Sequence, residues 1–168
     1  ASAQRASEVP GVTSVHEIRY GLGLLQSEDG RTGVSVQALP GTIVESDPQF
    51  RRYLEILDGN FDLGQEESLL LSRPIAAELD VQVGETMRLL TARSTSTGKY
   101  ILRQSVMEVK GVFTTGYHDL DEMTVLISSE RGRRLFTEDG SQVLAMKVDD
   151  PFGDLGGVSE KLRNALGP

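Results

Sequence analysis

The most regular hydrophobic pattern of the chain occupies residues 69–89. Three consecutive leucines open it, and such a run is typical of a strand that is buried on both faces. Pro74 then fits the first position of a helix. The next apolar residues recur at helical spacing: Ile75, Ala76 and Leu79. Beyond Gly84 apolar and polar residues alternate as far as Leu89, which indicates a second strand. The unit reads as a scaffold without catalytic features.

Alternating patterns predict several more strands. The first covers residues 12–25, and its half-buried face is expected to carry His16, Ile18, Tyr20, Leu22 and Leu24. The Asp29-Gly30 pair favours a hairpin turn, because both residue types tolerate the backbone that tight turns require. On the returning strand Val34, Val36 and Ala38 alternate with polar residues. Further strands are predicted at residues 85–91, 105–113, 123–128 and 142–148.

Three further helices are predicted, two of them between these strands and one after the last strand. Asp47 and Pro48 suit the N-cap and first position of a helix that ends at Gly59. Its apolar stripe is Phe50, Tyr53, Leu54 and Leu57. A short helix is predicted to run through Leu135-Phe136, and an amphipathic helix over residues 155–166. The mixture of strands and short helices predicts an α+β fold.

Composition limits the classes of function. The chain has 168 residues, a formal net charge of −8 and no cysteine. The negative charge disfavours nucleic-acid binding, which depends on Lys and Arg contacts to phosphates. It also argues against a polybasic anchor at a membrane surface. The lack of cysteine excludes disulfides and thiolate metal sites.

Both ends of the chain suggest a segment of a larger protein. Residues 1–12 resemble the end of a helix rather than a natural N-terminus, and residues 160–168 stop just after a predicted helix. No apolar run reaches the roughly 18–20 residues that cross a bilayer. We therefore expect the chain to be a segment cut from a larger protein.

Three segments together resemble a known family. They are GNFDL (residues 59–63), LLLSRPIAAELDVQVGETMRL (69–89) and VKGVFTTGYHDLDEMTVLIS (109–128). Their order and spacing are similar to those of the periplasmic domain of MacB/LolC/LolE-type ABC transporter permeases. Leu79, Val81, Val83 and Gly84 match a first family motif, in which Glu85 replaces the usual Asp. A second motif is matched by Val109, Gly111, Phe113, Gly116 and Asp121. The length and the first and third segments look closest to the lipoprotein-releasing LolC/LolE branch.

The resemblance implies a fold, a place and a set of partners. Such domains are α+β, strand-rich with short helices, and are described as two joined subdomains. The resemblance therefore implies a single extracytoplasmic domain, residues 1–168, excised from between the first and second membrane helices. They face the periplasm from a bacterial inner-membrane protein and are not catalytic, because a separate cytoplasmic ATPase subunit hydrolyses ATP. A second permease copy or paralogue completes the transporter. In the lipoprotein-releasing branch, the cargo passes from the inner membrane to a periplasmic carrier.

The same resemblance implies a partner-binding hairpin. In one of the paired lipoprotein-releasing permeases a protruding β-hairpin hook grips the carrier, and the matching place here is residues 92–104. The candidate contact residues are Thr97, Lys99, Tyr100, Ile101 and Leu102. Exposed aromatic and aliphatic groups on an edge strand suit strand addition or anchoring in a groove. An ordinary solvated hairpin, without the prolines associated with the hook, is the alternative.

Residues with catalytic or metal-binding potential offer little chemistry. His118, Asp119, Asp121 and Glu122 contain metal-ligating groups, but without a second nearby histidine they are better interpreted as an acidic turn that Asp121 orders. His16 reads as a packed or half-exposed strand residue. Gly98-Lys99 lacks the remaining residues of a phosphate loop, and Gly21-x-Gly23 lacks the third glycine of a dinucleotide site. Arg131, Arg133 and Arg134 read as a solvated face. We expect no catalytic residue, cofactor or metal.

Two classes of function therefore remain. The first is the non-catalytic permease domain, in lipoprotein release or alternatively in MacB-like efflux or FtsX-like mechanotransmission. The second is an isolated α+β enzyme or binding module whose site the sequence does not reveal.

Overall fold

The computed structural model describes residues 2–10, 12–136 and 141–148, together with the single positions 161 and 164. The chain divides into two compact units, one of residues 1–17 with 143–168 and one of residues 18–142. The helix predicted at 155–166 lies almost entirely outside the described residues. Within the described ranges, no helix has the length and hydrophobicity that a membrane span requires.

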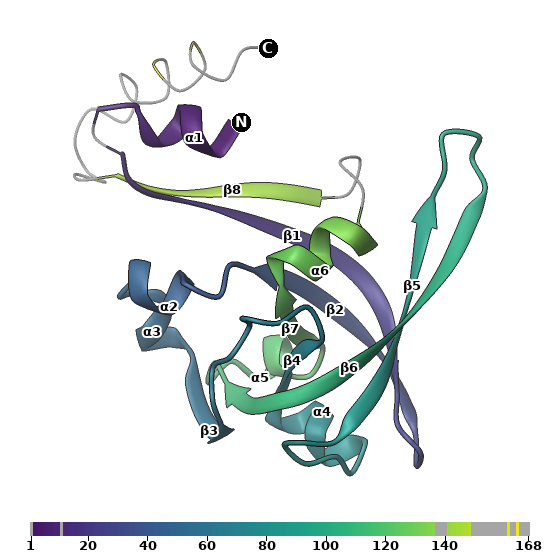
Figure 1. Cartoon of the computed structure of the whole chain (residues 1–168). Coiled ribbons are helices and arrows are strands. Elements are labelled where there is room, and N and C mark those ends of the chain that lie inside the picture. The colour runs from purple at the N-terminus through teal and green to yellow at the C-terminus, as the bar shows by residue number, and fades with distance from the viewer. Residues whose placement is uncertain (1, 11, 137–140, 149–160, 162–163, 165–168) are drawn as a thin grey trace. The chain divides into compact units, whose positions relative to one another are not determined.

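Short helices are interspersed among the strands along the chain (Figure 1). The helices are α1 (Ser2–Ser7), α2 (Ile43–Ser46), α3 (Phe50–Tyr53), α4 (Arg73–Glu78), α5 (His118–Asp121) and α6 (Ser129–Leu135). The strands are β1 (Val12–Gln26), β2 (Arg31–Leu39), β3 (Glu55–Gly59), β4 (Ser68–Ser72), β5 (Thr86–Ser94), β6 (Tyr100–Thr114), β7 (Thr124–Ser128) and β8 (Ser141–Val148). The prediction of a strand-rich α+β fold is confirmed.

In the unit of residues 18–142, six strands form a sheet that closes on itself. The strand order is β2-β7-β4-β6-β5-β1, and β1 also pairs with β2, which completes the ring. The β2–β7 and β4–β6 pairs are parallel and the other pairs of the ring are antiparallel. β3 adds to the far end of β6. In the other unit, α1 precedes the first part of β1, beside which β8 lies in the strand order.

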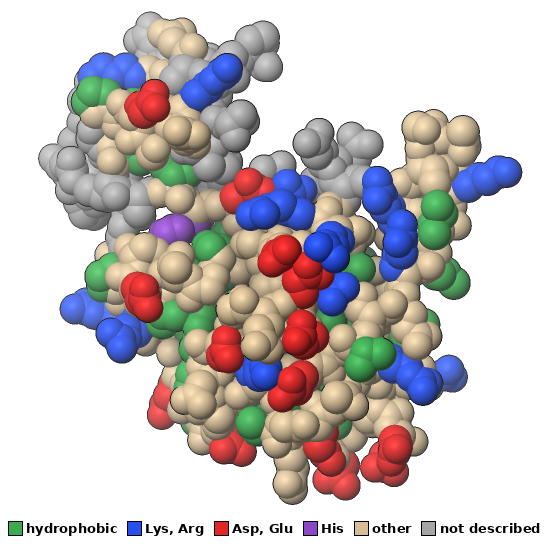
Figure 2. Space-filling view, viewed as in Figure 1, with side chains coloured by type: hydrophobic (Ala, Val, Ile, Leu, Met, Phe, Trp, Pro, Cys, Tyr) green, Lys and Arg blue, Asp and Glu red, His purple; other side chains and the backbone are tan. Residues whose placement is uncertain are grey.

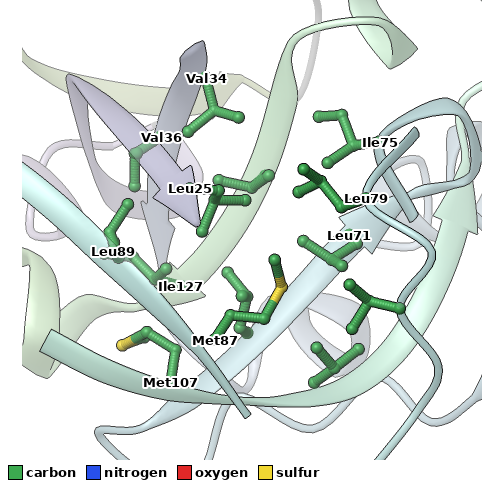
Figure 3. Packing of buried hydrophobic residues seen from close by; sticks show 14 of the residues in the cluster. Leu25, Val34, Val36, Leu71, Ile75, Leu79, Met87, Leu89, Met107 and Ile127 are labelled. Carbon is green, nitrogen blue, oxygen red and sulfur yellow. The ribbon is translucent and has the colours of Figure 1, made fainter. Parts of the chain in front are cut away.

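Side chains fill the inside of the closed sheet (Figure 3). The leucine run of β4 is buried on both faces, as predicted: Leu69 and Leu71 belong to the inner cluster, whereas Leu70 belongs to a second cluster outside the sheet. The inner cluster also includes Ile75 and Leu79 of the α4 segment. Such close packing makes the body of the sheet a rigid support for the segments that extend from it.

The phase of β1 differs from the prediction. Leu22, expected on the half-buried face, is 79% exposed, whereas Leu25 is fully buried. The inward positions before Leu25 are held by Gly21 and Gly23. A Cβ on Gly21 would lie 2.0 Å from the Phe136 ring, so this glycine makes room for an aromatic side chain. Because glycine carries no side chain, it leaves no hydrophobic signal in the sequence.

The helix predicted from Asp47 to Gly59 is wrong. Only α3, a single turn, forms there, and Leu57 lies in β3. Asp47 does accept hydrogen bonds at the start of the turn, from the backbone N–H groups of Gln49 (2.9 Å) and Phe50 (3.3 Å). Pairing of β3 with β6 takes the following residues into the sheet instead. Tertiary pairing thus overrides the local helical spacing.

Candidate functional site

The predicted hairpin is a long two-stranded ribbon rather than a loop. β5 and β6 stay paired from Thr86 opposite Glu108 to Ser94 opposite Tyr100. We use "the ribbon" for residues 86–107. β1 pairs with β5 only at residues 88–91, so the end of the ribbon beyond them extends away from the closed sheet (Figure 1). Most of residues 92–104, expected to lie between two strands, are therefore strand residues.

The tip of the ribbon is an ordered turn. The N–H of Gly98 donates to the carbonyl of Thr95 (2.9 Å), and the N–H of Thr95 donates to the carbonyl of Lys99 (2.7 Å). Gly98 has a φ of +75°, which favours glycine at this position. The Thr95 and Thr97 hydroxyls lie 2.9 Å apart, and the Thr95 hydroxyl also accepts the N–H of Lys99 (3.1 Å). This network fixes the direction in which the ribbon ends.

The candidate contact residues are all exposed but do not share one face. Tyr100 and Leu102 are each 76% exposed, and Ile101 is 45% exposed. Because side chains of a strand alternate, Tyr100 and Leu102 lie on one face of the ribbon and Ile101 on the other. Thr97 and Lys99 lie in and beside the exposed tip. The three apolar residues therefore lie on both faces of the ribbon.

The ribbon differs from the rest of the chain in charge. It contains Arg88, Arg93, Lys99 and Arg103 but none of the 25 Asp and Glu of the chain, which has a net charge of −8. Figure 2 shows Lys and Arg side chains along the projecting ribbon, whereas Asp and Glu gather over the body of the sheet. The ribbon thus combines exposed apolar groups with a local excess of positive charge.

The acidic turn at residues 118–122 has a structural role. Asp121 is buried and accepts the hydroxyls of Thr114 and Thr115, each at 2.6 Å, and the N–H of Thr115 at 3.0 Å. The interpretation that Asp121 orders this bend is confirmed. His118 instead pairs with Glu122 at 2.9 Å on the surface. No group of three or more potential metal ligands converges in the described part of the chain.

Burial and hydrogen bonding act in opposite directions on the pKa of Asp121. Burial by itself raises the pKa, because it disfavours the charged carboxylate. Hydrogen bonds from the two threonine hydroxyls and from the N–H groups of Thr115 and Gly116 outweigh this effect and hold the pKa below its usual value. Asp121 is therefore a charged anchor of the bend, and its oxygens are already occupied.

The arginines of α6 also make specific contacts. Arg131 and Arg134 both reach Glu66, at 3.6 and 2.6 Å, and the Arg131 side chain also donates to the Glu66 carbonyl (3.1 Å). The prediction of a solvated face is wrong for Arg131, which is half-buried, whereas Arg134 is exposed as predicted. Both residues attach α6 to the loop before β4. Arg133 is exposed. His16, as expected, is a half-buried residue of β1.

Sequence reasoning missed a small apolar pocket. It has a volume of about 130 Å³ and lies beside α3 and α5. Its lining residues are Gln37, Phe50, Tyr53, Leu54, Phe113, Thr115, Leu120, Thr124 and Leu126. At this site the side chain of Tyr53 is 62% exposed and that of Leu120 is 50% exposed. The available signal was the apolar spacing of residues 50–54, which we interpreted as the core stripe of a longer helix.

Solved structures provide the comparison with known proteins. The extracellular domain of the noncanonic ABC-type transporter YknZ from Gram-positive bacteria matches with a TM-score of 0.68 at 12% identity, over 98% of this chain and 80% of that one. The periplasmic region of MacB from Actinobacillus actinomycetemcomitans matches with a TM-score of 0.63 at 13% identity, over 99% of this chain and 73% of that one. No protein-family profile and no curated protein sequence matches the chain. At these identities the likeness is one of fold.

Proposed function

We propose that this chain is the extracytoplasmic domain of an ABC transporter permease, placed between the first and second membrane helices of the full-length protein. The observation that carries the proposal is the similarity in fold to the YknZ and MacB domains over 98% or more of the chain. In this role the domain is not catalytic. A cytoplasmic ATPase subunit supplies the energy, and a second permease copy or paralogue completes the transporter.

The packing of the closed sheet supports a mechanical role. Its interior is filled by buried aliphatic side chains, including Leu25, Leu71 and Leu89. A close-packed core resists deformation, so movement of the membrane helices would displace this unit as a rigid body. The projecting ribbon would move with it, because β5 and β6 belong to the same closed sheet.

The proposed location is tested by cysteine labelling. The chain has no cysteine, so Ser96→Cys at the exposed ribbon tip introduces the single thiol of the domain. In cells producing the full-length protein, we expect this variant to react with a maleimide that does not cross the inner membrane. Ser105→Cys, at a buried position of the same ribbon, is the matched control and should react only after denaturation. Labelling of Ser96→Cys only after the inner membrane is opened would contradict the proposal.

Within this class we propose lipoprotein release, with the ribbon tip binding a periplasmic lipoprotein carrier. The contact residues would be Thr97, Lys99, Tyr100, Ile101 and Leu102. Exposed aromatic and aliphatic side chains near a turn offer the apolar area that interface anchors use. Efflux is the second candidate, and the likeness to the MacB region favours it. An FtsX-like role would use the same rigid-body movement.

The choice between these branches is tested by capture of the carrier. We expect the triple variant Tyr100→Ser, Ile101→Ser, Leu102→Ser of the full-length permease to capture at least tenfold less carrier in a pull-down. Leu22→Ser is the control, because Leu22 is equally exposed but lies in β1. Equal capture by the triple variant and the unmodified protein would contradict carrier binding and favour efflux.

A further inference from the structure

The outer edge of β6 carries unpaired backbone groups along the ribbon. The N–H of Glu108 donates to the carbonyl of Glu67, at the point where β4 joins this edge (2.7 Å). Backbone groups of a strand alternate between its two edges. The N–H and C=O groups of the residues two, four, six and eight positions earlier therefore point to the same edge: Val106, Gln104, Leu102 and Tyr100. Among the described residues, only β5 pairs with β6 in this stretch, on the opposite edge.

The two faces of the ribbon differ beside this free edge. On one face lie the exposed side chains of Tyr100, Leu102 and Val106, and Arg88 lies on the paired strand opposite Val106. On the other face Arg103 is exposed, and Arg93 lies on the paired strand opposite Ile101. A strand added along the edge would place alternate side chains beside the apolar residues of β6 on one face and beside Arg103 on the other. The matching sequence alternates apolar and acidic residues.

We propose that the edge of β6 from Tyr100 to Val106 binds an extended segment of a partner protein by strand addition, and that this segment alternates apolar and acidic residues. The inference specifies the partner chemistry of the ribbon and rests on its proposed role as a binding element. Main-chain hydrogen bonds would supply affinity, and the alternation of side chains would supply specificity. The seven residues of the edge span roughly 20 Å at about 3.3 Å per residue.

Charge complementarity selects this occupant. A second copy of the chain would pair the same edge with itself and bring the cations of one ribbon against those of the other, which is destabilising. A bilayer of anionic lipid would attract the cations, but it does not present a row of acceptors with backbone spacing to the N–H groups of the edge. An acidic extended peptide satisfies both the backbone and the charges.

The test uses the purified chain and two labelled ten-residue peptides, one of alternating Val and Glu and one of alternating Val and Lys. By fluorescence anisotropy we expect the Val/Glu peptide to bind at least tenfold more tightly, with an affinity that falls as salt is added. Arg103→Glu should reverse the preference. Equal binding of the two peptides, or no binding of the Val/Glu peptide, would overturn the proposal.

A proline at the free edge separates strand addition from simple charge attraction. Gln104→Pro removes an N–H that points outward, and edge strands tolerate proline at such positions. We expect this variant to lose at least tenfold in affinity for the Val/Glu peptide while its circular dichroism stays unchanged. Gln104→Ala, which keeps the N–H, should bind normally. If Gln104→Pro does not fold, Leu102→Pro, which removes another N–H of the same edge, provides the same test.

Two further outcomes would overturn the proposal in favour of another occupant. Binding to phosphatidylglycerol vesicles, with none to the Val/Glu peptide, would assign the ribbon to lipid headgroups. Dimerisation that is abolished by Gln104→Pro would assign the edge to a second copy. Labelling of Ser96→Cys reports the location of the domain independently, so failure of this inference remains distinguishable from failure of the proposed function.

Discussion

At the scale of single residues, the carboxylate of Asp121 fixes the bend between β6 and α5. Its oxygens accept from Thr114 and Thr115, and the Ser72 hydroxyl donates to the main-chain oxygen of the same residue. One buried acid thereby ties the end of β4 to the end of β6. The hydrogen bonds from the two threonines require the charged form of the carboxylate, because a protonated carboxyl loses part of its accepting capacity.

This requirement predicts an acid-dependent loss of stability. Because the pKa of folded Asp121 is lowered, its contribution is fully present above the unfolded pKa of about 3.9 and is lost as pH falls through the folded value. We expect Asp121→Asn to lower the free energy of unfolding at pH 7 by about 2 kcal/mol. The difference from the unmodified protein should shrink below about pH 4. Urea unfolding across pH measures both quantities.

Asp119→Asn is the matched control, because Asp119 is exposed on the same one-turn helix. It should leave the pH dependence unchanged. Parallel pH curves for Asp121→Asn and the unmodified protein would show that the carboxylate does not stabilise the bend.

The sequence indicated the role of Asp121 but not its partners. An acidic residue after Gly116-Tyr117 favours an ordered turn, because Asp accepts nearby backbone N–H groups. Ser72 lies 49 residues away in the chain, and no local pattern relates it to Asp121.

Leu22 shows the opposite case, in which the local pattern predicted the wrong face of the strand. The glycines at the inward positions of β1 hide the true phase of the strand.

At the scale of elements, the packing of α6 on β2 depends on one glycine. A Cβ on Gly132 would lie 2.2 Å from the Cβ of Ala38, a rigid atom that cannot rotate away. The helix therefore lies close against the sheet, and its N-terminus is capped by the Ser128 hydroxyl, which accepts the N–H of Arg131 (3.2 Å). A short helix of low intrinsic stability is held by its contacts rather than by propensity.

We predict that Gly132→Ala destabilises the protein by about 1–3 kcal/mol, because overpacking exceeds the gain of about 1 kcal/mol in helix propensity. Ala38→Gly in the same chain should recover part of the loss, since it frees the space for the new methyl group. Arg133→Ala, on the exposed side of α6, serves as the control and should change stability by less than about 0.5 kcal/mol. Guanidinium unfolding of the four proteins provides the values. A more stable Gly132→Ala variant would show that α6 can move off the sheet at little cost.

The ribbon is the other element whose character depends on its neighbours. Its sequence already contained the turn residues and the cations, and both could be read without the structure. Its exposure could not, because that follows from where β1 and β4 stop pairing with β5 and β6. Beyond those points no further described strand lies beside the ribbon. The side chains toward its tip are therefore mostly exposed.

At the scale of the whole molecule, closure of the sheet is the decisive feature. β1 pairs with both β2 and β5, so the ring has no free edge between those two strands. The pattern of each strand in the sequence does not reveal the closure of the sheet, because the β1–β5 pairing joins residues more than sixty positions apart. Closure encloses one core cluster, and the double-faced strands β4 and β7 separate it from the second.

The sequence by itself determined the strand-rich α+β class, the β4–α4–β5 unit, the first hairpin and the absence of cysteine chemistry. These follow from periods of two and three to four residues, which depend on neighbours along the chain. Only the tertiary structure decided that β3 is a strand, that Leu22 faces outward and that the ribbon edge is free. Each of these depends on which distant segment lies alongside, and hydrogen bonding and burial between distant segments outweigh local preference.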